Sequence, residues 1–387
     1  MSDRYRRINL DAVFKDTQLG VINKSISMTM TGMRTGHRKL ITPTSKENYG
    51  FVFLTRPQLN LSSPNVHRHR PFMPLLSSNK SSIASWIRGT LDPRWAKYGD
   101  IAWGMNAIRE TKSSDLSDGG LTYDTVTPIV NEHASQVDNR SPFINIISNN
   151  VVQVSGFPDI DMPVFTADPN RIGHSFQMID GTENLNMPVD ITLTVQDVTG
   201  NPIYNLFRVL SLYPGRIYAN QMIKYPDFIE QDTIDYNVRL YRILLSPNGR
   251  KVVHIGSTFP GFVQGVASGS RYDFSLETPY TEDNMVSLRL MFGGVEYDDP
   301  VLIDDFNMTV MSTNEDMRPI DDNGTRPNMT KIPHHQINHF SYERVYPFID
   351  IDTYELEWWT TTERYNRIAA EIGQFYRADK ATPVINA

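Results

Sequence analysis

Apolar and polar residues alternate most clearly in the middle of the chain. The odd-numbered positions from 189 to 195 are Val, Ile, Leu and Val, and the even-numbered ones are Asp, Thr, Thr and Gln. This alternation predicts a half-buried antiparallel strand over residues 189–198. It returns over residues 236–245 and 286–292. Ser246-Pro247-Asn248-Gly249 has the composition of a tight turn, from which residues 251–255 are expected to pair back as a hairpin.

The hydrophobic period lengthens to that of a helix after residue 198. Asn201 is predicted as the N-cap and Pro202 as the first helical residue. The apolar positions that follow have helical spacing: Ile203, Leu206, Phe207 and Leu210. Pro214-Gly215 is expected to break or kink this helix. Four side chains are predicted to be buried in the same region: Leu193, Phe207, Leu240 and Leu290.

Further elements are predicted on both sides of this region. The apolar run Phe51–Leu54 suits a buried strand, and Trp86, Trp95 and Trp103 fall in a stretch of short helices over 83–110. Two β-branched runs separated by Asn149-Asn150 predict a β-hairpin. Near the C-terminus, residues 363–376 have apolar side chains on one helical face.

These patterns predict an α+β fold: an antiparallel β-sandwich or barrel-like domain with one packed helix, flanked by irregular N-terminal and C-terminal extensions. Four parts are expected: an extended arm over 1–48, a mixed loop-rich region over 49–184, the β domain with its helix over 185–310, and an acidic extension with a terminal helix over 311–387. The arm has no periodic apolar pattern, so we expect it to become ordered only against neighbouring molecules.

Composition narrows the class of protein. The 387 residues contain no cysteine, which excludes a disulfide scaffold, thiolate metal sites and a cysteine nucleophile. No run of 18 apolar residues exists, so no membrane-spanning helix is expected, and the N-terminus lacks the apolar segment of a signal peptide.

Charge is distributed unevenly around a net charge of −7. Residues 1–100 hold 16 Lys and Arg against 6 Asp and Glu, residues 101–280 hold 12 against 19, and residues 281–387 hold 9 against 19. One interpretation is that the positive part of one subunit meets the negative part of the next. There are two alternatives. The basic first third could bind nucleic acid, although its basic residues do not form the runs of a nucleic-acid patch, or the sign of the local charge could vary by chance along the chain.

Two groups of histidines could suggest a metal site. His67 and His69 form one group, and His334, His335 and His339 form the other. The second group reads H-Q-I-N-H where a zinc protease would have H-E-x-x-H, and Pro333 argues against a helix interior. Exposed loop histidines are the simpler interpretation, so no metal is predicted.

Paired carboxylates with neighbouring aromatics could suggest carbohydrate chemistry. Glu355, Glu357, Trp358 and Trp359 would be the candidates for a carbohydrate-binding or carbohydrate-cleaving module. Closely spaced acids more often form a solvated face. The sequence contains no G-x-S-x-G, phosphate-binding loop or dinucleotide-binding motif. We therefore predict no catalytic, cofactor-binding or metal-binding residues and no enzyme activity. A cytoplasmic α+β enzyme without a visible motif remains an alternative.

Three segments of the central region resemble the tube-forming proteins of contractile phage tails and related injection machines. They are DITLTVQDVTGNPIYNLFRVLSLYP, DYNVRLYRILLSPNGRKVV and FPGFVQGVASGS. YGFVFLTRPQLNL is similar to a segment of structural proteins in large tailed phages. The likeness covers about a third of the chain, which also has long additions before and after it, and so looks more like a baseplate or tube-end component than a plain tube subunit.

The resemblance implies a virion structural protein, a tail tube or baseplate inner-tube component. Its partners would be further copies in a ring, with six-fold symmetry implied, neighbouring tail tube or baseplate proteins, and DNA that passes through the lumen without sequence-specific contacts. It would be assembled in the host cytoplasm and reside in the virion tail. Other structural roles remain open: tail terminator, head–tail connector or baseplate wedge. We further expect acidic side chains to outnumber basic ones on the lumen surface, because a basic wall would hold DNA.

Overall fold

The computed structural model describes residues 50–95, 137–246, 249–268, 285–321, 324–340 and 344–370, except 78, 80, 81, 170 and 182–186. The predicted arm over 1–48, Trp103, and the end of the predicted helix at 371–376 lie outside these residues.

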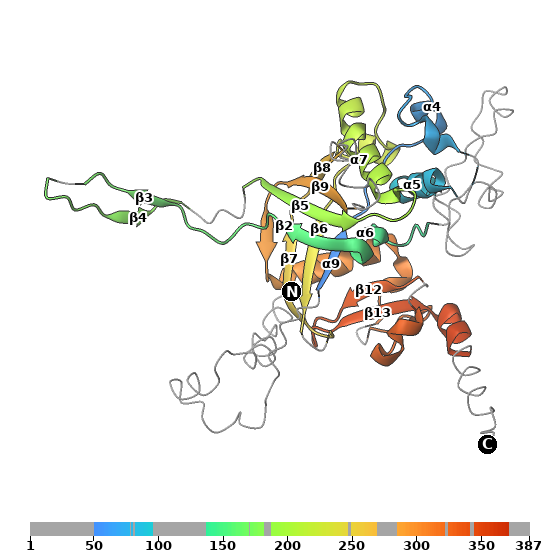
Figure 1. The fold of residues 1–387 in the computed structure, drawn as a ribbon. Coiled ribbons are helices and arrows are strands. Elements are labelled where there is room, and N and C mark those ends of the chain that lie inside the picture. Colours follow the sequence, from blue (N-terminus) through green and yellow to red (C-terminus); the bar gives the residue numbers. More distant parts are fainter. Residues whose placement is uncertain are drawn as a thin grey trace, which may run out of the picture. The chain divides into compact units, whose positions relative to one another are not determined.

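Figure 1 shows the described elements as short helices and several separate sheets. The α-helices are α4 (Ser63–Val66), α5 (Ile83–Leu91), α6 (Asn145–Asn150), α7 (Pro202–Tyr218), α8 (Pro226–Glu230) and α9 (Pro300–Thr313). The 3-10 helices are η2 (Met73–Leu76), η3 (Pro93–Trp95), η9 (Glu315–Met317) and η10 (His334–Phe340). The strands are β1 (Gly50–Leu54), β2 (Val151–Ser155), β3 (Val164–Thr166), β4 (Gln177–Ile179), β5 (Val189–Gln196), β6 (Leu240–Leu245), β7 (Val252–Thr258), β8 (Gly261–Val266), β9 (Met285–Phe292), β10 (Val295–Tyr297), β11 (Met329–Lys331), β12 (Tyr346–Ile349) and β13 (Leu356–Thr361).

The largest core lies between an antiparallel sheet, in the order β2-β5-β9-β8, and helix α7. The predicted strands at 189–198 and 286–292 are confirmed as β5 and β9, which pair from Val189 opposite Phe292 to Gln196 opposite Met285. The four side chains predicted to be buried are at most 1% exposed: Leu193, Phe207, Leu240 and Leu290.

Helix α7 begins where the sequence predicts, with Asn201 at the N-cap position, but another side chain supplies the capping bonds. Asn201 has a left-handed backbone (φ 51°) and makes no capping bond with its side chain. Instead, the buried carboxylate of Asp197 accepts hydrogen bonds from the N–H groups of Ile203 and Tyr204, both at 3.1 Å. Pro214 does not break the helix, which continues to Tyr218. The predicted start and the N-cap position of Asn201 are therefore confirmed, although Asp197 supplies the capping bonds, and the helix does not break at Pro214.

The predicted hairpin around Asn149-Asn150 is wrong. These residues end helix α6, in which the Asn150 side chain donates to the carbonyl of Ile146 at 2.8 Å. The second β-branched run forms β2, whose partner is the distant strand β5. Local alternation could not reveal this, because the pairing strand lies about 40 residues further along the chain.

A second sheet has the order β1-β6-β7-β10. It confirms the predicted strand at Phe51–Leu54, and β6 and β7 are neighbours as predicted. The main-chain N–H of Ser246 donates to the carbonyl of Lys251 at 2.8 Å, and Gly249 takes the left-handed conformation (φ 70°) that the turn requires.

The C-terminal region holds a third sheet, β11-β13-β12, that the sequence patterns did not predict. Helix α9, also unpredicted, begins after Asp299, whose carboxylate accepts from the N–H of Val301 at 2.8 Å. Its buried Asn307 side chain bonds both main-chain groups of Ile349 on β12, at 2.7 and 2.9 Å. Residues 362–370 are helical, in agreement with the predicted terminal helix.

The described chain forms two compact units, one comprising residues 52–241 and 256–297 and the other including residues 242–255 and 298–370. The expectation of an α+β fold built on antiparallel sheets is confirmed. Among the residues described, no sheet closes on itself to form a barrel.

Candidate functional site: the surfaces available for assembly

Two of the four carbohydrate candidates are used for internal contacts. Glu357 is 9% exposed; one of its oxygens accepts from Lys331 Nζ, and the other from Trp359 Nε1 at 2.9 Å. The guanidinium of Arg326 lies over the Trp359 ring at 4.5 Å and over the Phe348 ring at 4.2 Å. Because both carboxylate oxygens and the indole ring have internal partners, these groups act as structural side chains.

A cavity of about 250 Å³ lies beside strand β13. Glu355, Glu357 and Trp358 line it, together with His334 and His335, whereas Trp359 does not. The structure thus brings three of the carbohydrate candidates to one cavity. Within the described part of the chain, no three potential metal ligands gather into a cluster.

His67, His69 and His339 do not line this cavity. His67 is exposed, and His69 Nε2 lies 2.9 Å from the carbonyl oxygen of Gln221. A membrane-crossing helix is not found among the residues that the structure describes.

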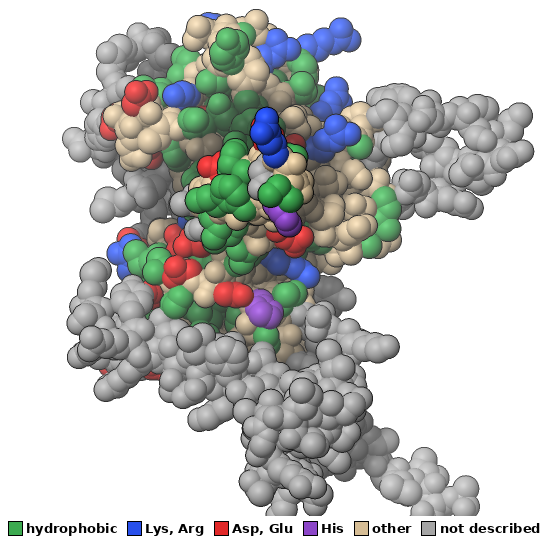
Figure 2. Space-filling model, turned by 90° about the vertical axis from the view of Figure 1, so that its left-hand side faces the viewer, with side chains coloured by type: hydrophobic (Ala, Val, Ile, Leu, Met, Phe, Trp, Pro, Cys, Tyr) green, Lys and Arg blue, Asp and Glu red, His purple; other side chains and the backbone are tan. Residues whose placement is uncertain are grey.

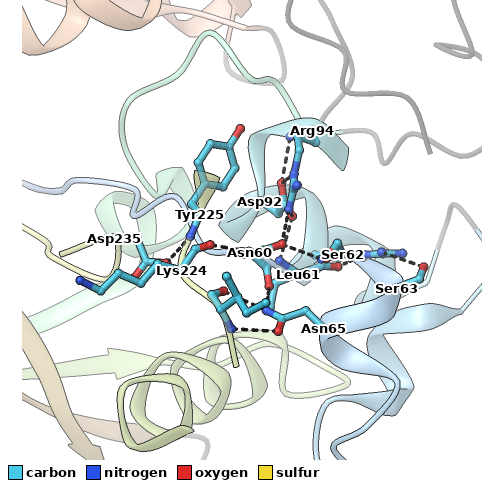
Figure 3. A network of polar contacts seen from close by, with 12 residues as sticks. Asn60, Leu61, Ser62, Ser63, Asn65, Asp92, Arg94, Lys224, Tyr225 and Asp235 are labelled. Carbon is cyan, nitrogen blue, oxygen red and sulfur yellow. Dashed lines mark hydrogen bonds and ion pairs between the residues drawn. The ribbon is translucent and has the colours of Figure 1, made fainter. Parts of the chain in front are cut away.

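The most connected polar cluster is buried in the unit that contains α7 (Figure 3). Asp235 is 1% exposed, and its Oδ2 accepts from the Tyr213 hydroxyl at 2.6 Å and from the Tyr225 N–H at 2.9 Å. The Tyr213 hydroxyl also accepts from the N–H of Asn60 at 3.2 Å. Burial raises the pKa of the Asp235 carboxyl, although these donors oppose the shift.

Asp92 and Arg94 form the other half of this cluster. The Arg94 guanidinium donates to both oxygens of Asp92, at 2.8 and 2.7 Å, and to Asn60 Oδ1 at 2.7 Å. Asp92 also accepts from the N–H of Leu61 at 2.9 Å. The cluster joins segments that are distant in sequence and so ties them together within this unit.

An exposed ion pair links β7 to Asp298, two residues before the start of α9. His254 Nδ1 lies 3.0 Å from Asp298 Oδ2, and their side chains are 58% and 53% exposed. The hydrogen bond that His254 donates to the Asp298 carboxylate raises the pKa of His254. Burial tends to raise the pKa of Asp298, but the hydrogen bonds from His254 and from the N–H of Ile255 lower it overall.

Two surfaces present groups suited to association. The first is the pair of outer strands of the four-stranded sheet, β2 and β8, each of which carries a register shift. Such bulges are frequent at sheet edges and barrel rims. Outer strands with unpaired N–H and C=O groups are templates for pairing with another chain.

The second surface is the β3–β4 hairpin (Figure 1). It pairs Val164 with Ile179 and Phe165 with Met178, and the bonds that hold it lie within the hairpin itself. Eight large apolar side chains in and beside it are 50–80% exposed: Ile160, Met162, Val164, Phe165, Ile172, Phe176, Met178 and Ile179. Figure 2, turned so that the left-hand side of Figure 1 faces the viewer, shows hydrophobic side chains gathered at the centre of that face.

Sequence reasoning missed this hairpin. The segment 157–181 has three proline residues and four aspartates, which resemble a loop, and its strands are only three residues long. The available signal was the density of large apolar residues between those breakers.

A protein-family model described as "putative phage tail tube protein" matches residues 5–374. No curated protein matches the sequence. The solved structures that are similar to this chain at low identity include the following three. The tube-terminating cap of the anti-feeding prophage is 16% identical, with 38% of this chain and 79% of that chain covered and a TM-score of 0.23.

The other two come from an extracellular contractile injection system, PVC, in the extended state. Its sheath/tube terminator is 15% identical, covers 38% of this chain and 85% of its own, and has a TM-score of 0.23. A chain of its sheath–tube complex is 16% identical, covers 41% of this chain and 82% of its own, and has a TM-score of 0.24. The family assignment rests on the family model, which spans nearly the whole chain.

Proposed function

Because the chain belongs to the putative phage tail tube protein family, and is therefore a structural tail protein, we propose that its copies form a ring around a lumen that conducts DNA. The observation that carries this proposal is the four-stranded sheet whose outer strands, β2 and β8, have no named strand beyond them among the described elements, apart from a single bridge between Val238 and Gly261 at the start of β8. Pairing β2 of one copy with β8 of the next is a heterologous contact, and such contacts close into a ring when the rotation permits. The proposed ring contains six copies, as the resemblance to tube-forming proteins implies.

The face of this sheet away from the core supplies the wall of the lumen. Its side chains on the two central strands include Asp190 and Arg289, one acid and one base, among Thr192, Thr194 and Ser287. This face lacks the acidic excess that we expected, and we propose a nearly neutral wall. A wall with few cations gives DNA little counterion release and so does not hold its phosphates.

The remaining parts of the chain are assigned by the same proposal. Residues 185–310, with strand β2, supply the tube body, while 1–48, the rest of 49–184 and 311–387 contact neighbouring copies or other tail or baseplate proteins. No residue is proposed as catalytic, cofactor-binding or metal-binding. The basic first third would meet acidic neighbours at subunit junctions, so association should weaken as salt rises above about 0.15 M, where exposed charges are screened over about 8 Å.

Lysine substitutions on the two outer strands test ring closure. Val152→Lys lies on β2 and Phe262→Lys on β8, and both side chains are exposed. A lysine on an edge strand disfavours pairing with another strand. The full chain should form rings in electron micrographs and have an oligomer mass by light scattering, and each variant should lose both. Val198→Lys, exposed between β5 and α7, is the matched control and should still form rings.

Mixing the two variants makes the test specific. If the contact is heterologous, each variant keeps one unmodified outer strand. The unmodified β8 of one variant can pair with the unmodified β2 of the other, so the mixture should form dimers and no larger oligomers. Rings from both lysine variants, or a wild-type chain that stays monomeric at high concentration and low salt, would overturn the proposal. Stacked rings would indicate a tube, whereas single rings would favour a terminator or baseplate component.

A further inference from the structure

The β3–β4 hairpin is apolar on both faces. Its register places Val164 and Ile179 on one face and Phe165 and Met178 on the other, since side chains alternate along a strand. Phe176 lies two residues before Met178 and so shares its face. An isolated two-stranded hairpin is at best marginally stable in water. A ribbon with such side chains on both faces requires a partner to cover it.

The exposed area is large enough to form an interface. The eight exposed side chains named above present on the order of 800 Å² of apolar surface, about what each partner buries in a standard interface. A soluble monomer seldom exposes an apolar patch larger than a few hundred Å². The hairpin therefore has the area of a binding element.

A complementary surface lies elsewhere in the same unit, where the turn after α4 meets the loop after α7. The Asn65 side chain donates to the carbonyl of Ile223 at 3.1 Å and accepts from its N–H at 3.0 Å, and so joins the two segments. Ile223 is 64% exposed and Met73 is 45% exposed. We call Arg68, Arg70, Met73 and Ile223 the turn surface; both arginine side chains are exposed.

The charges of the two surfaces are opposite. Residues 157–181 contain four aspartates, Asp159, Asp161, Asp168 and Asp180, against one arginine. All four are exposed. Residues 51–91, which include Arg68, Arg70 and Met73 of the turn surface, contain five Lys and Arg and no Asp or Glu. Opposite charges around an apolar centre guide the encounter and fix the register of an interface.

We propose that the β3–β4 hairpin of one copy docks on the turn surface of a second copy, with its apolar residues against Met73 and Ile223 and its aspartates near Arg68 and Arg70. This inference rests on the proposed function, because its partner is another copy in the same assembly. The contact is separate from the β2–β8 pairing, so each copy would hold its neighbours at two places.

Cysteine cross-linking tests this contact, because the chain has no cysteine of its own. Met178→Cys in one preparation and Ile223→Cys in a second, tagged to a different mass, are mixed, assembled and treated with a short bismaleimide. A heterodimer of the two tagged chains is expected. Val301→Cys, an exposed aliphatic position on α9, replaces Ile223→Cys in the control and should give none.

Charge reversal provides a second measurement. Arg68→Glu with Arg70→Glu should abolish the cross-link, and Asp161→Lys with Asp180→Lys on the partner should restore it. Arg208→Glu, on the exposed side of α7, is the control and should leave it unchanged. Rings that form without this cross-link would overturn the hairpin contact and leave the proposed ring intact. A chain that remains monomeric would overturn both.

Discussion

Removing the Tyr213 hydroxyl should weaken the buried cluster around Asp235. In Tyr213→Phe the Asp235 carboxylate loses its donor at 2.6 Å, and the N–H of Asn60 loses its acceptor at 3.2 Å. A hydrogen bond to a charged group contributes about 1.5–3 kcal/mol, and a buried group left unpaired adds to the loss, so we expect a decrease of about 2–4 kcal/mol in the free energy of unfolding. Urea unfolding followed by tryptophan fluorescence, at concentrations where the chain is monomeric, measures it.

The pH dependence gives a sharper test of the same cluster. The folded pKa of Asp235 lies above the unfolded value of about 3.9, so the folded state binds this proton more tightly. The stability supplied by the proton is present below pH 4 and is lost as pH rises through the folded pKa. Asp235→Asn lacks this proton. Wild type should therefore lose stability relative to Asp235→Asn as pH rises above about 4.

Parallel pH curves for wild type and Asp235→Asn between pH 4 and 7 would refute the reasoning. So would a Tyr213→Phe variant whose unfolding midpoint is unchanged. Tyr236→Phe is the control, because the Tyr236 ring only packs edge-on against Tyr213 at 6.5 Å.

Three further results are expected. Leu193→Ala removes a fully buried side chain and should lower the free energy of unfolding by about 2–5 kcal/mol; an unchanged midpoint would contradict the packing of β5. Gly261→Ala should strongly lower the melting temperature, because the added Cβ would lie 2.1 Å from a main-chain oxygen of β9. In Gly265→Ala the added Cβ would have no neighbouring atom within 4 Å, so this control should melt at the wild-type temperature. The His254–Asp298 pair should stabilise the fold most between about pH 4 and 6.5. The pKa of His254 is raised, so its stabilising contribution is lost as pH rises above this range; the pKa of Asp298 is lowered, so its contribution is lost as pH falls below it. If the difference in stability between wild type and Asp298→Asn does not vary with pH, the pair does not contribute in this way.

The sequence predicted those parts of the fold in which local pattern and burial agree. Strand β5 alternates because one face packs on α7, and Pro202 marks the helix start because proline suits a first turn. Helix α9 carries the same signal, Asp299 followed by Pro300, but its apolar residues surround Asp304 and Asp305 without a clear face. The pattern therefore favoured no element there.

The candidate surfaces were harder to predict than the secondary structure. Glu357 and Trp359 looked like ligand-binding groups, because sequence does not reveal that Lys331 and Arg326 already contact them. The hairpin was missed for a related reason. Its large apolar side chains are mostly exposed, so burial within one copy does not explain their placement.

The side chain of Asn307 has a consequence for how copies can join. It bonds the N–H and C=O of Ile349 as a neighbouring strand would, and Pro347 on the same strand has no N–H to offer. Strand β12 therefore cannot readily pair with a strand of another chain, because the Asn307 side chain already bonds the main-chain groups of Ile349. In the proposed ring, copies would therefore join through β2 and β8 of the other sheet, and the β12 edge of the C-terminal sheet would take no part in strand pairing.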